Sequence, residues 1–138
     1  MRFFLDNCLS PAFADALHGL SERDGHEVTH LRRKFDAGAK DEMWLAALGV
    51  EGDWIVVSGD HRIVKKPHLR KVWLEAKLTT FFMVDSFQNL KFWLQIRHLV
   101  RWWPDIVEVA GRVAPGAGFT VPLRSSRMEQ VRVPGEKA

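Results

Sequence analysis

The chain has one cysteine, no tyrosine and no long apolar run, and each shortage excludes a class of protein. Cys8 alone cannot form an internal disulfide or a cysteine-based zinc site, and we expect a small buried apolar residue rather than a catalytic thiol. No run is long enough to cross a membrane. The apolar start Phe3–Leu5 meets Asp6 at once, which is too short for a signal peptide. We therefore expect a cytoplasmic protein without a membrane association.

No extreme of charge marks the chain either. Charged residues make up 27% and hydrophobic residues 46% of the 138 residues, which favours one packed domain over disorder. A net charge of +3 allows nucleic acid as a partner but does not require it. Most of the six tryptophans are expected in the core or in interfaces. The six histidines show no close metal-ligand spacing.

Basic residues gather in two runs, one around residues 32–34 and one around residues 65–71. We expect the first run on a loop, and two such runs on loops beside an acidic pocket would favour capture of a phosphate backbone. We choose Arg32, Arg33, Lys65 and Lys66 as candidates for binding RNA phosphates. The alternative is an ordinary solvated face.

Short apolar runs alternate with helical stretches along most of the chain. We expect strands at residues 2–6, 26–30, 54–57 and 79–84. We expect helices from Ser10–Pro11, from near Asp41, from Pro67, and from about Asn89 to Trp103, after which Pro104 kinks or restarts the helix. This alternation predicts an α/β fold with a mainly parallel central sheet of about four strands, covered by helices on both faces.

The pattern changes after Arg112. Residues 114–118 predict a loop and residues 119–124 a short strand, while the polar tail from Ser125 is expected to be disordered or ordered only against a partner. We therefore divide the chain into a domain at residues 1–113 and a C-terminal extension at residues 114–138 that contacts a partner.

Three aspartates are expected at one edge of the sheet. Asp6 ends the first strand, Asp60 follows the third, and Asp41 begins a helix between them. Ligands bind beyond the carboxyl ends of parallel strands, and carboxylates gathered there repel one another unless a cation lies among them. Oxygen ligands suit Mg²⁺ or Mn²⁺, which can activate a water and stabilise charge on a phosphodiester. The three aspartates are thus our candidate catalytic and metal-binding residues.

Each of these acids has a simpler explanation. Asp6 can begin the turn after its strand, Asp41 can cap its helix, and Asp60 suits a Ser-Gly-Asp turn. We favour function for Asp6 because a charge at the inner end of an apolar strand costs desolvation energy. Cap and metal ligand are equally good explanations of Asp41.

Four further polar residues are held in reserve or given supporting roles. Glu42 points about 100° away from Asp41 on the helix, and Asp85 follows the fourth strand. Asn7 and Ser58 lie beside the acids and could orient a carboxylate or a water, although loop capping is at least as good an explanation of both.

The run Phe4-Leu5-Asp6-Asn7, the Pro-started helix, the Asp-led helix and the run from Ile55 to Asp60 together resemble a PIN-like domain. Within that family, the sequence is similar to the VapC-type toxins of type II toxin–antitoxin systems, specifically to the atypical subgroup with a Trp-rich second half. The resemblance covers roughly residues 2–112. The resemblance implies a three-layer sandwich and a Mg²⁺-dependent endoribonuclease. It assigns Asp6, Asp41 and Asp60 as the metal-binding acids. It also implies a cognate antitoxin, and a homodimer or higher toxin–antitoxin assembly.

One position departs from this family pattern. Related sequences often carry a further acid two places after the last one, where this chain has Arg62. Arg62 supports a second hypothesis, a catalytically weakened PIN-like module that binds RNA or a protein without cleaving. A receiver-type phosphoacceptor domain is disfavoured, since Asn7 replaces the second acid after the first strand and no lysine ends the fourth.

Overall fold

The computed structural model describes residues 1–133 and contains a six-stranded sheet in the order β2-β1-β3-β4-β5-β6. Its strands are β1 (Arg2–Leu5), β2 (Glu27–His30), β3 (Trp54–Ser58), β4 (Thr79–Met83), β5 (Gly118–Val121) and β6 (Glu129–Gln130). All neighbouring pairs are parallel except β5 and β6. The α/β class and the mainly parallel sheet are confirmed, but the expected number of about four strands was wrong.

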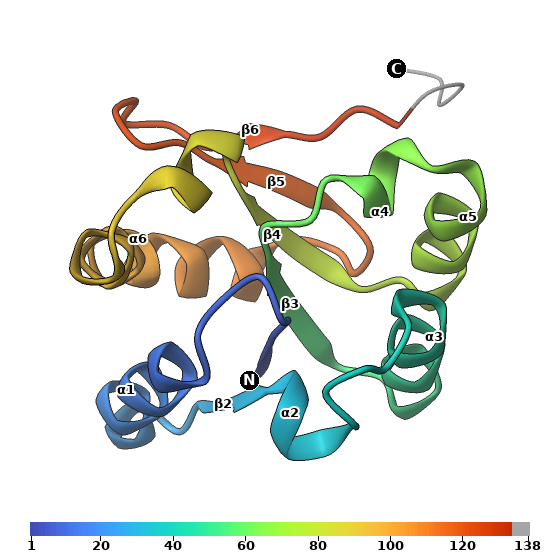
Figure 1. The fold of residues 1–138 in the computed structure, drawn as a ribbon, viewed down its shortest axis with the longest axis horizontal. Helices are drawn as coiled ribbons and strands as arrows, with labels where there is room; N and C mark the ends of the chain where they lie inside the picture. Colours follow the sequence, from blue (N-terminus) through green and yellow to red (C-terminus); the bar gives the residue numbers. More distant parts are fainter. Residues whose placement is uncertain (134–138) are drawn as a thin grey trace.

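Helices cover the sheet on both faces (Figure 1). The longer ones are α1 (Pro11–Ser21), α3 (Asp41–Glu51), α5 (Pro67–Ala76) and α6 (Phe92–Arg112), and the short ones are η1 (Glu22–Asp24), α2 (Leu31–Lys34), α4 (Arg62–Lys65) and η2 (Asp85–Asn89). Helices α1 and α6 lie on one side, and α3, α4 and α5 lie on the other (Figure 1). The fold is therefore a three-layer arrangement of helices, sheet and helices.

The core lies in two clusters, one on each face of the sheet. Along β1, Phe3 and Leu5 pack into the cluster beneath α1 and α6, while Phe4 packs with Trp44 beneath α3. Alternate side chains of a strand point to opposite faces, so a strand buried on both faces is apolar at every position. Five of the six tryptophans are at most 7% exposed, and Trp93 on α6 is 79% exposed. The expectation that most tryptophans are buried is confirmed.

Helix beginnings follow the sequence signals in one case and differ in another. The Ser10 hydroxyl accepts a hydrogen bond from the Ala12 amide at 3.2 Å, and Pro11 opens α1, as expected. In α3 the cap position belongs to Lys40, and Asp41 lies inside the first helical turn. The cap explanation of Asp41 was therefore wrong, and its side chain is available for other contacts.

Both basic runs begin in helical turns, whereas the first was expected on a loop. Arg32 and Arg33 lie in α2, and Lys65 ends α4, with Lys66 directly after it. These four-residue helices are too short to give a periodic apolar pattern, so the sequence did not predict either of them.

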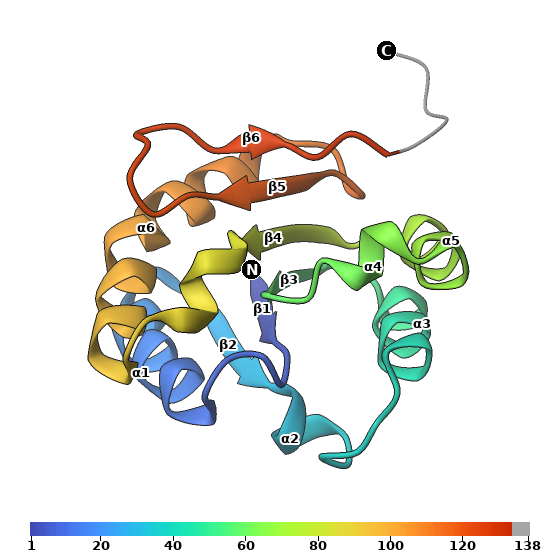
Figure 2. The same cartoon turned by 45° about the horizontal axis from the view of Figure 1, so that its top comes forward.

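Helix α6 begins and ends later than expected. Residues 85–89 form η2, and α6 continues through Pro104 to Arg112. Trp102, Trp103 and Ile106 are all buried around the proline, so packing holds the helix where a hydrogen bond is lost. The helix changes direction along its length (Figures 1 and 2), as a proline inside a helix commonly causes.

The chain after α6 joins the central sheet. The expected strand near residues 119–124 is present as β5, which pairs with β4, and β6 lies beside it (Figure 2). The Val131 amide donates to the Gly118 carbonyl at 2.7 Å, and the tail expected to be disordered or ordered only against a partner follows β5 as far as Val133. Residues 134–138 of that expectation lie outside the described residues. Among the helices of residues 1–133, none has the length and apolar character to cross a membrane.

Candidate active site

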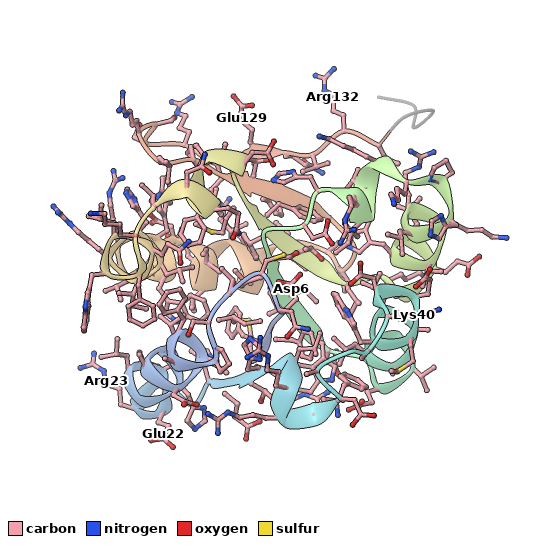
Figure 3. The ribbon with its side chains drawn as sticks, in the orientation of Figure 1. Asp6, Glu22, Arg23, Lys40, Glu129 and Arg132 are labelled. Atoms are coloured by element: carbon pink, nitrogen blue, oxygen red, sulfur yellow. The ribbon has the colours of Figure 1, made fainter. Side chains whose placement is uncertain are left out.

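Two aspartates lie next to each other because two parallel strands end side by side. Leu5 of β1 pairs with Val57 of β3, and the Asp6 amide donates to the Val57 carbonyl at 3.4 Å. Asp6 is 3% exposed and Asp60, two residues beyond Ser58, is 8% exposed. Figure 3 shows Asp6 near the middle of the molecule, where the chain leaves β1, with Lys40 at the start of α3.

Ser58 joins the two aspartates. Its hydroxyl donates to Asp6 Oδ2 at 2.5 Å and accepts a hydrogen bond from the Asp60 amide at 2.9 Å. The Cys8 amide donates to the other carboxylate oxygen of Asp6 at 3.1 Å. Ser58 is fully buried, so these contacts fix the orientation of the Asp6 carboxylate without solvent. Each of the two roles weighed for Ser58 has a corresponding contact: the bond to Asp6 orients a carboxylate, and the bond from the Asp60 amide caps the turn.

The carboxylate of Asp6 is buried, and the hydrogen-bond donors that contact it are uncharged. Burial raises its pKa from 3.8 to about 7, and the nearby charges of Asp60 and Asp41 act in the same direction. The hydrogen bonds from Ser58 and Cys8 oppose the increase only in part. Asp6 therefore holds or releases a proton close to neutral pH.

Asp60 differs from Asp6 because its carboxylate is paired with a positive charge, the guanidinium of Arg62. Arg62 Nε and Nη2 donate to the two oxygens of Asp60 at 2.9 and 2.7 Å, and the Arg62 amide donates to Oδ1 at 3.0 Å. Burial acts to raise the pKa of Asp60, but these charge-assisted bonds outweigh it and hold the pKa below its ordinary value. Asp60 thus stays ionised.

Asp41 approaches the same group from α3. Its Oδ1 accepts a hydrogen bond from Trp44 Nε1 at 3.1 Å, and its Oδ2 lies 3.9 Å from Arg62 Nη2. Burial raises the pKa of Asp41, and the charge of Asp60 adds to the increase. The three aspartates therefore face one rim, with the Arg62 guanidinium between Asp41 and Asp60.

The contacts of the three aspartates determine whether a divalent metal ion fits between them. The oxygen donors are those that Mg²⁺ prefers. However, residues 1–133 contain no group of three His, Cys, Asp or Glu side chains placed to hold a metal ion. Both oxygens of Asp60 are bonded to Arg62. The residues do not fit a bound metal while Arg62 holds this position.

Three other residues chosen from the sequence lie outside this group. Asn7 donates to the Ala37 carbonyl at 2.7 Å and so joins two loops, which is the structural role weighed for it. Glu42 lies 3.3 Å from His68 Nε2. Asp85, with a side chain 77% exposed, lies 3.4 Å from His61 Nε2. Neither reserve acid joins the three aspartates.

The four basic candidates divide into two kinds. Arg32 Nε donates to Asn7 Oδ1 at 3.2 Å, beside Asp6, whereas Arg33 pairs with Asp15 of α1 at 2.6 Å. Lys65 and Lys66 are exposed, and Lys65 shares α4 with Arg62. Arg32 is therefore linked to the acids through Asn7 and Lys65 shares a helix with Arg62, whereas Arg33 is paired with Asp15.

Two neighbours of the site were not singled out as site residues. Burial first, and then the charge of Asp6, raise the pKa of the Cys8 thiol to about 12, so it stays protonated as expected of a residue that is not a nucleophile. Gln88 of η2 reaches over Gly59, where a side chain on the glycine would collide with the Gln88 amide. Only the glycine in the Ser-Gly-Asp run hints at this close approach.

Comparison with protein-family models finds a match to the PIN-like domain over residues 1–85. The matched segment is more than half of the chain and contains β1 to β4 and all three aspartates. No curated protein and no solved structure matches the chain.

Proposed function

The chain belongs to the PIN-like domain family, and on that premise we propose that it is a Mg²⁺-dependent endoribonuclease acting as the toxin of a toxin–antitoxin pair. PIN-like domains are commonly nucleases and usually use divalent metals. The reaction would be hydrolysis of RNA phosphodiester bonds at the rim formed by Asp6, Asp41 and Asp60. Mn²⁺ is the alternative metal.

The observation that carries the proposal is the pairing of Asp6 and Asp60 through Ser58 at adjacent strand ends. Three buried or half-buried carboxylates face one another there, and burial together with mutual repulsion raises the pKa of Asp6 and of Asp41. Such a group gains stability from a cation, which is the electrostatic requirement of a metal-dependent nuclease.

The proposal requires Arg62 to leave Asp60, because both oxygens of that carboxylate are otherwise bonded. The Arg62 side chain is 62% exposed, so solvent and ligands reach it without unfolding of the domain. Basic side chains on α2 and α4, chiefly Arg32 and Lys65, would hold flanking phosphates of the RNA.

Cleavage of total RNA by the purified, antitoxin-free protein tests the proposal. We expect cleavage with Mg²⁺ or Mn²⁺, none with a chelator, and loss of cleavage in Asp6→Asn and in Asp60→Asn with the fold retained. Asp24→Asn is a matched control, since its side chain is 59% exposed and pairs with its neighbour Arg23. Cleavage that persists in both Asp6→Asn and Asp60→Asn would contradict the site.

A second function is favoured by one contact, the two-pronged bond from Arg62 to Asp60. If this contact is permanent, the protein is a PIN-like module that binds RNA or a protein without cleaving it. Soluble protein that binds RNA, yet shows no metal-dependent cleavage in either the wild type or Arg62→Gln, would favour this function.

A toxin of this kind is expected to have protein partners. We propose a cognate antitoxin that blocks the acid rim, and a homodimer or higher toxin–antitoxin assembly, on the sequence resemblance. A small DNA-binding protein encoded next to this chain would support the pairing, and co-expression of the two should yield a stable complex with suppressed RNA cleavage.

A further inference from the structure

One tryptophan differs from the other five in its exposure. Trp93, in the first turn of α6, is 79% exposed, whereas the others are at most 7% exposed. Its ring meets that of Phe92 at nearly a right angle, with the centroids 5.6 Å apart. Phe92 in turn packs on Phe13 of α1, with the centroids 4.9 Å apart. The Trp93 indole is therefore held from one side and open to a ligand on the other.

The charge that accompanies Trp93 on α6 is of one sign. Arg97 and Arg101 follow it at successive intervals of four residues, so the indole and the two guanidiniums lie along one side of the helix. No Asp or Glu occurs from residue 86 to residue 104. Within residues 1–133, neither arginine forms an ion pair with an acid. Side chains with nitrogen tips project outward from α6 on the left of Figure 3. This positive charge is therefore available to a ligand.

A hollow of about 380 Å³ opens beside the two arginines, and it is lined by Leu94, Arg97, His98 and Arg101. The Arg101 guanidinium lies 5.2 Å from the centre of the Trp102 ring, and its Nη1 donates to the Leu123 carbonyl at 3.4 Å. In the part of the chain that the structure describes, His98 Nδ1 is buried without a hydrogen-bond partner. Burial first, and then the charges of Arg101 and Arg97, lower the pKa of His98. The hollow is therefore electropositive and suits an anion.

Helix η2 connects this face of α6 to the acid rim. Gln95 of α6 donates to the Phe87 carbonyl at 3.2 Å, and Gln88 reaches over Gly59, next to Asp60. A polymer bound along the start of α6 can therefore continue over η2 towards the three aspartates. The face adjoins the rim but shares no residue with it.

We infer that the exposed face of α6 formed by Trp93, Arg97 and Arg101 is a separate binding surface for single-stranded RNA, on which a base stacks against the indole and the guanidiniums bind the neighbouring phosphates. Aromatic rings and arginines together bind single strands because every base has a planar face and every nucleotide carries a phosphate. The planar donors of arginine match a phosphate. The inference goes beyond the proposed function, since binding here requires neither the three aspartates nor cleavage.

The arrangement favours RNA over an anionic membrane surface. A helix that lies in a membrane interface inserts one apolar face and keeps its charges on the other. Here Trp93 shares one side of α6 with Arg97 and Arg101, so inserting the indole would draw both charges towards the apolar layer. A base stacked on the indole instead brings its own phosphates to the guanidiniums.

Fluorescence anisotropy of a labelled single-stranded RNA of about twelve nucleotides, with a chelator present to exclude metal-dependent cleavage, tests the inference. Trp93→Ala should weaken the RNA affinity roughly tenfold, and Trp93→Phe should retain most of it because stacking survives. Arg97→Gln should weaken binding as well. It should also reduce the steepness of log affinity against log salt by about 0.7, the value for one phosphate contact on a single strand.

Two substitutions serve as matched controls that should leave the RNA affinity unchanged. Arg112→Gln removes the same charge from the far end of α6, about 16 Å along the axis from Arg101. Val50→Ala shortens an apolar side chain of α3 that is 89% exposed. NMR titration of the histidine rings locates the phosphates, because RNA bound at this face should raise the pKa of His98. Circular dichroism confirms that each variant is folded.

The outcomes separate this inference from the proposed function. Unchanged RNA affinity in both Trp93→Ala and Arg97→Gln overturns the inference, and cleavage of total RNA then tests the proposed function independently. Weakened RNA binding in both variants, with no metal-dependent cleavage by the wild type, supports the surface and contradicts the nuclease. Wild-type protein that binds no RNA overturns the inference. So does sedimentation with phosphatidylglycerol vesicles that Trp93→Ala abolishes without a change in RNA affinity, because the occupant would then be a membrane.

Discussion

The ends of β1 and β3 carry the same residue type on adjacent strands, yet their electrostatic states are opposite. Asp6 accepts hydrogen bonds from the uncharged groups of Ser58 and Cys8, and burial raises its pKa to about 7. Asp60 accepts hydrogen bonds from a guanidinium, and its pKa is lowered. The protein therefore supplies its own cation, Arg62, to the carboxylate after β3, whereas the carboxylate after β1 has only uncharged hydrogen-bond donors.

The largest expected effect lies at the strand end without a cation. The folded pKa of Asp6, about 7, exceeds its ordinary value of 3.8, so between these pH values the folded chain holds a proton that the unfolded chain releases. The contribution of Asp6 to stability must therefore fall as pH rises from about 4 to about 7, by on the order of 4 kcal/mol. Asp6→Asn removes this loss, so its stability advantage over the wild type should grow with pH.

Urea unfolding of both proteins at several pH values, with a chelator present, measures this difference. Comparing the variant with the wild type cancels the titration of the other acids. A difference that does not change between pH 4 and pH 8 would mean that Asp6 is ionised in the folded state and that the two strand ends are alike.

The next effect concerns the hydroxyl that joins the two strand ends. Ser58→Ala removes a donor from Asp6 and an acceptor from the Asp60 amide in a fully buried position, and should cost about 2 kcal/mol. Since the Ser58 hydrogen bond lowers the pKa of Asp6, its loss should raise that pKa further. Denaturation measures the cost, and carboxyl NMR titration measures the pKa.

Ser10→Ala is the matched control for that substitution. It removes only the cap of α1 and should cost about 1 kcal/mol without affecting the titration of Asp6. If Ser10→Ala and Ser58→Ala raised the pKa of Asp6 equally, the effect of Ser58 would come from the lower stability of the fold and not from its hydrogen bond to Asp6.

Much of this arrangement could be predicted from the sequence, because it depends on local patterns. The apolar runs at β1, β3 and β4 mark strands buried on both faces, and acids directly after such runs must lie at the same edge of a parallel sheet. The positions of Asp6 and Asp60 follow from that rule alone. Strand β5 was expected as a short strand, but its place beside β4 depends on long-range pairing that no local pattern records.

The electrostatic contrast could not be predicted in the same way. Arg62 was noticed as a departure from a family pattern, not as a partner of Asp60. Its contact depends on the turn at His61 and the four-residue helix α4, which orient the guanidinium back onto the carboxylate. A helix of one turn leaves no periodic signal, so the sequence indicates the charge but not its direction.

A smaller effect is expected at the strand end that has its cation. Arg62→Gln should cost only about 1 kcal/mol at neutral pH in the absence of metal, because the arginine side chain is largely exposed. The folded pKa of Asp60 is lowered, so the stability from this pair is present above pH 3.8 and is lost as pH falls through the folded pKa. The cost of the substitution should therefore vanish in acid, the reverse of the trend for Asp6→Asn.

Unfolding at neutral and acid pH, with Arg23→Gln as the control, checks the prediction for Arg62. A cost that persists in strong acid would indicate that Arg62 stabilises the domain through packing rather than through Asp60.

The smallest effect is expected at the acid that follows β4. Asp85→Asn should change stability by less than about 0.5 kcal/mol and leave the titration of Asp6 unchanged, since the side chain of Asp85 is 77% exposed and faces His61. Urea unfolding measures the change in stability, and the NMR titration that follows Asp6 measures its pKa. If Asp85→Asn lowered the pKa of Asp6 as much as Asp60→Asn does, the charge of Asp85 after β4 would act on Asp6 as strongly as the charge of Asp60 after β3. The contrast between Asp6 and Asp60 would then depend on the distance of each from Asp85 as well as on Arg62.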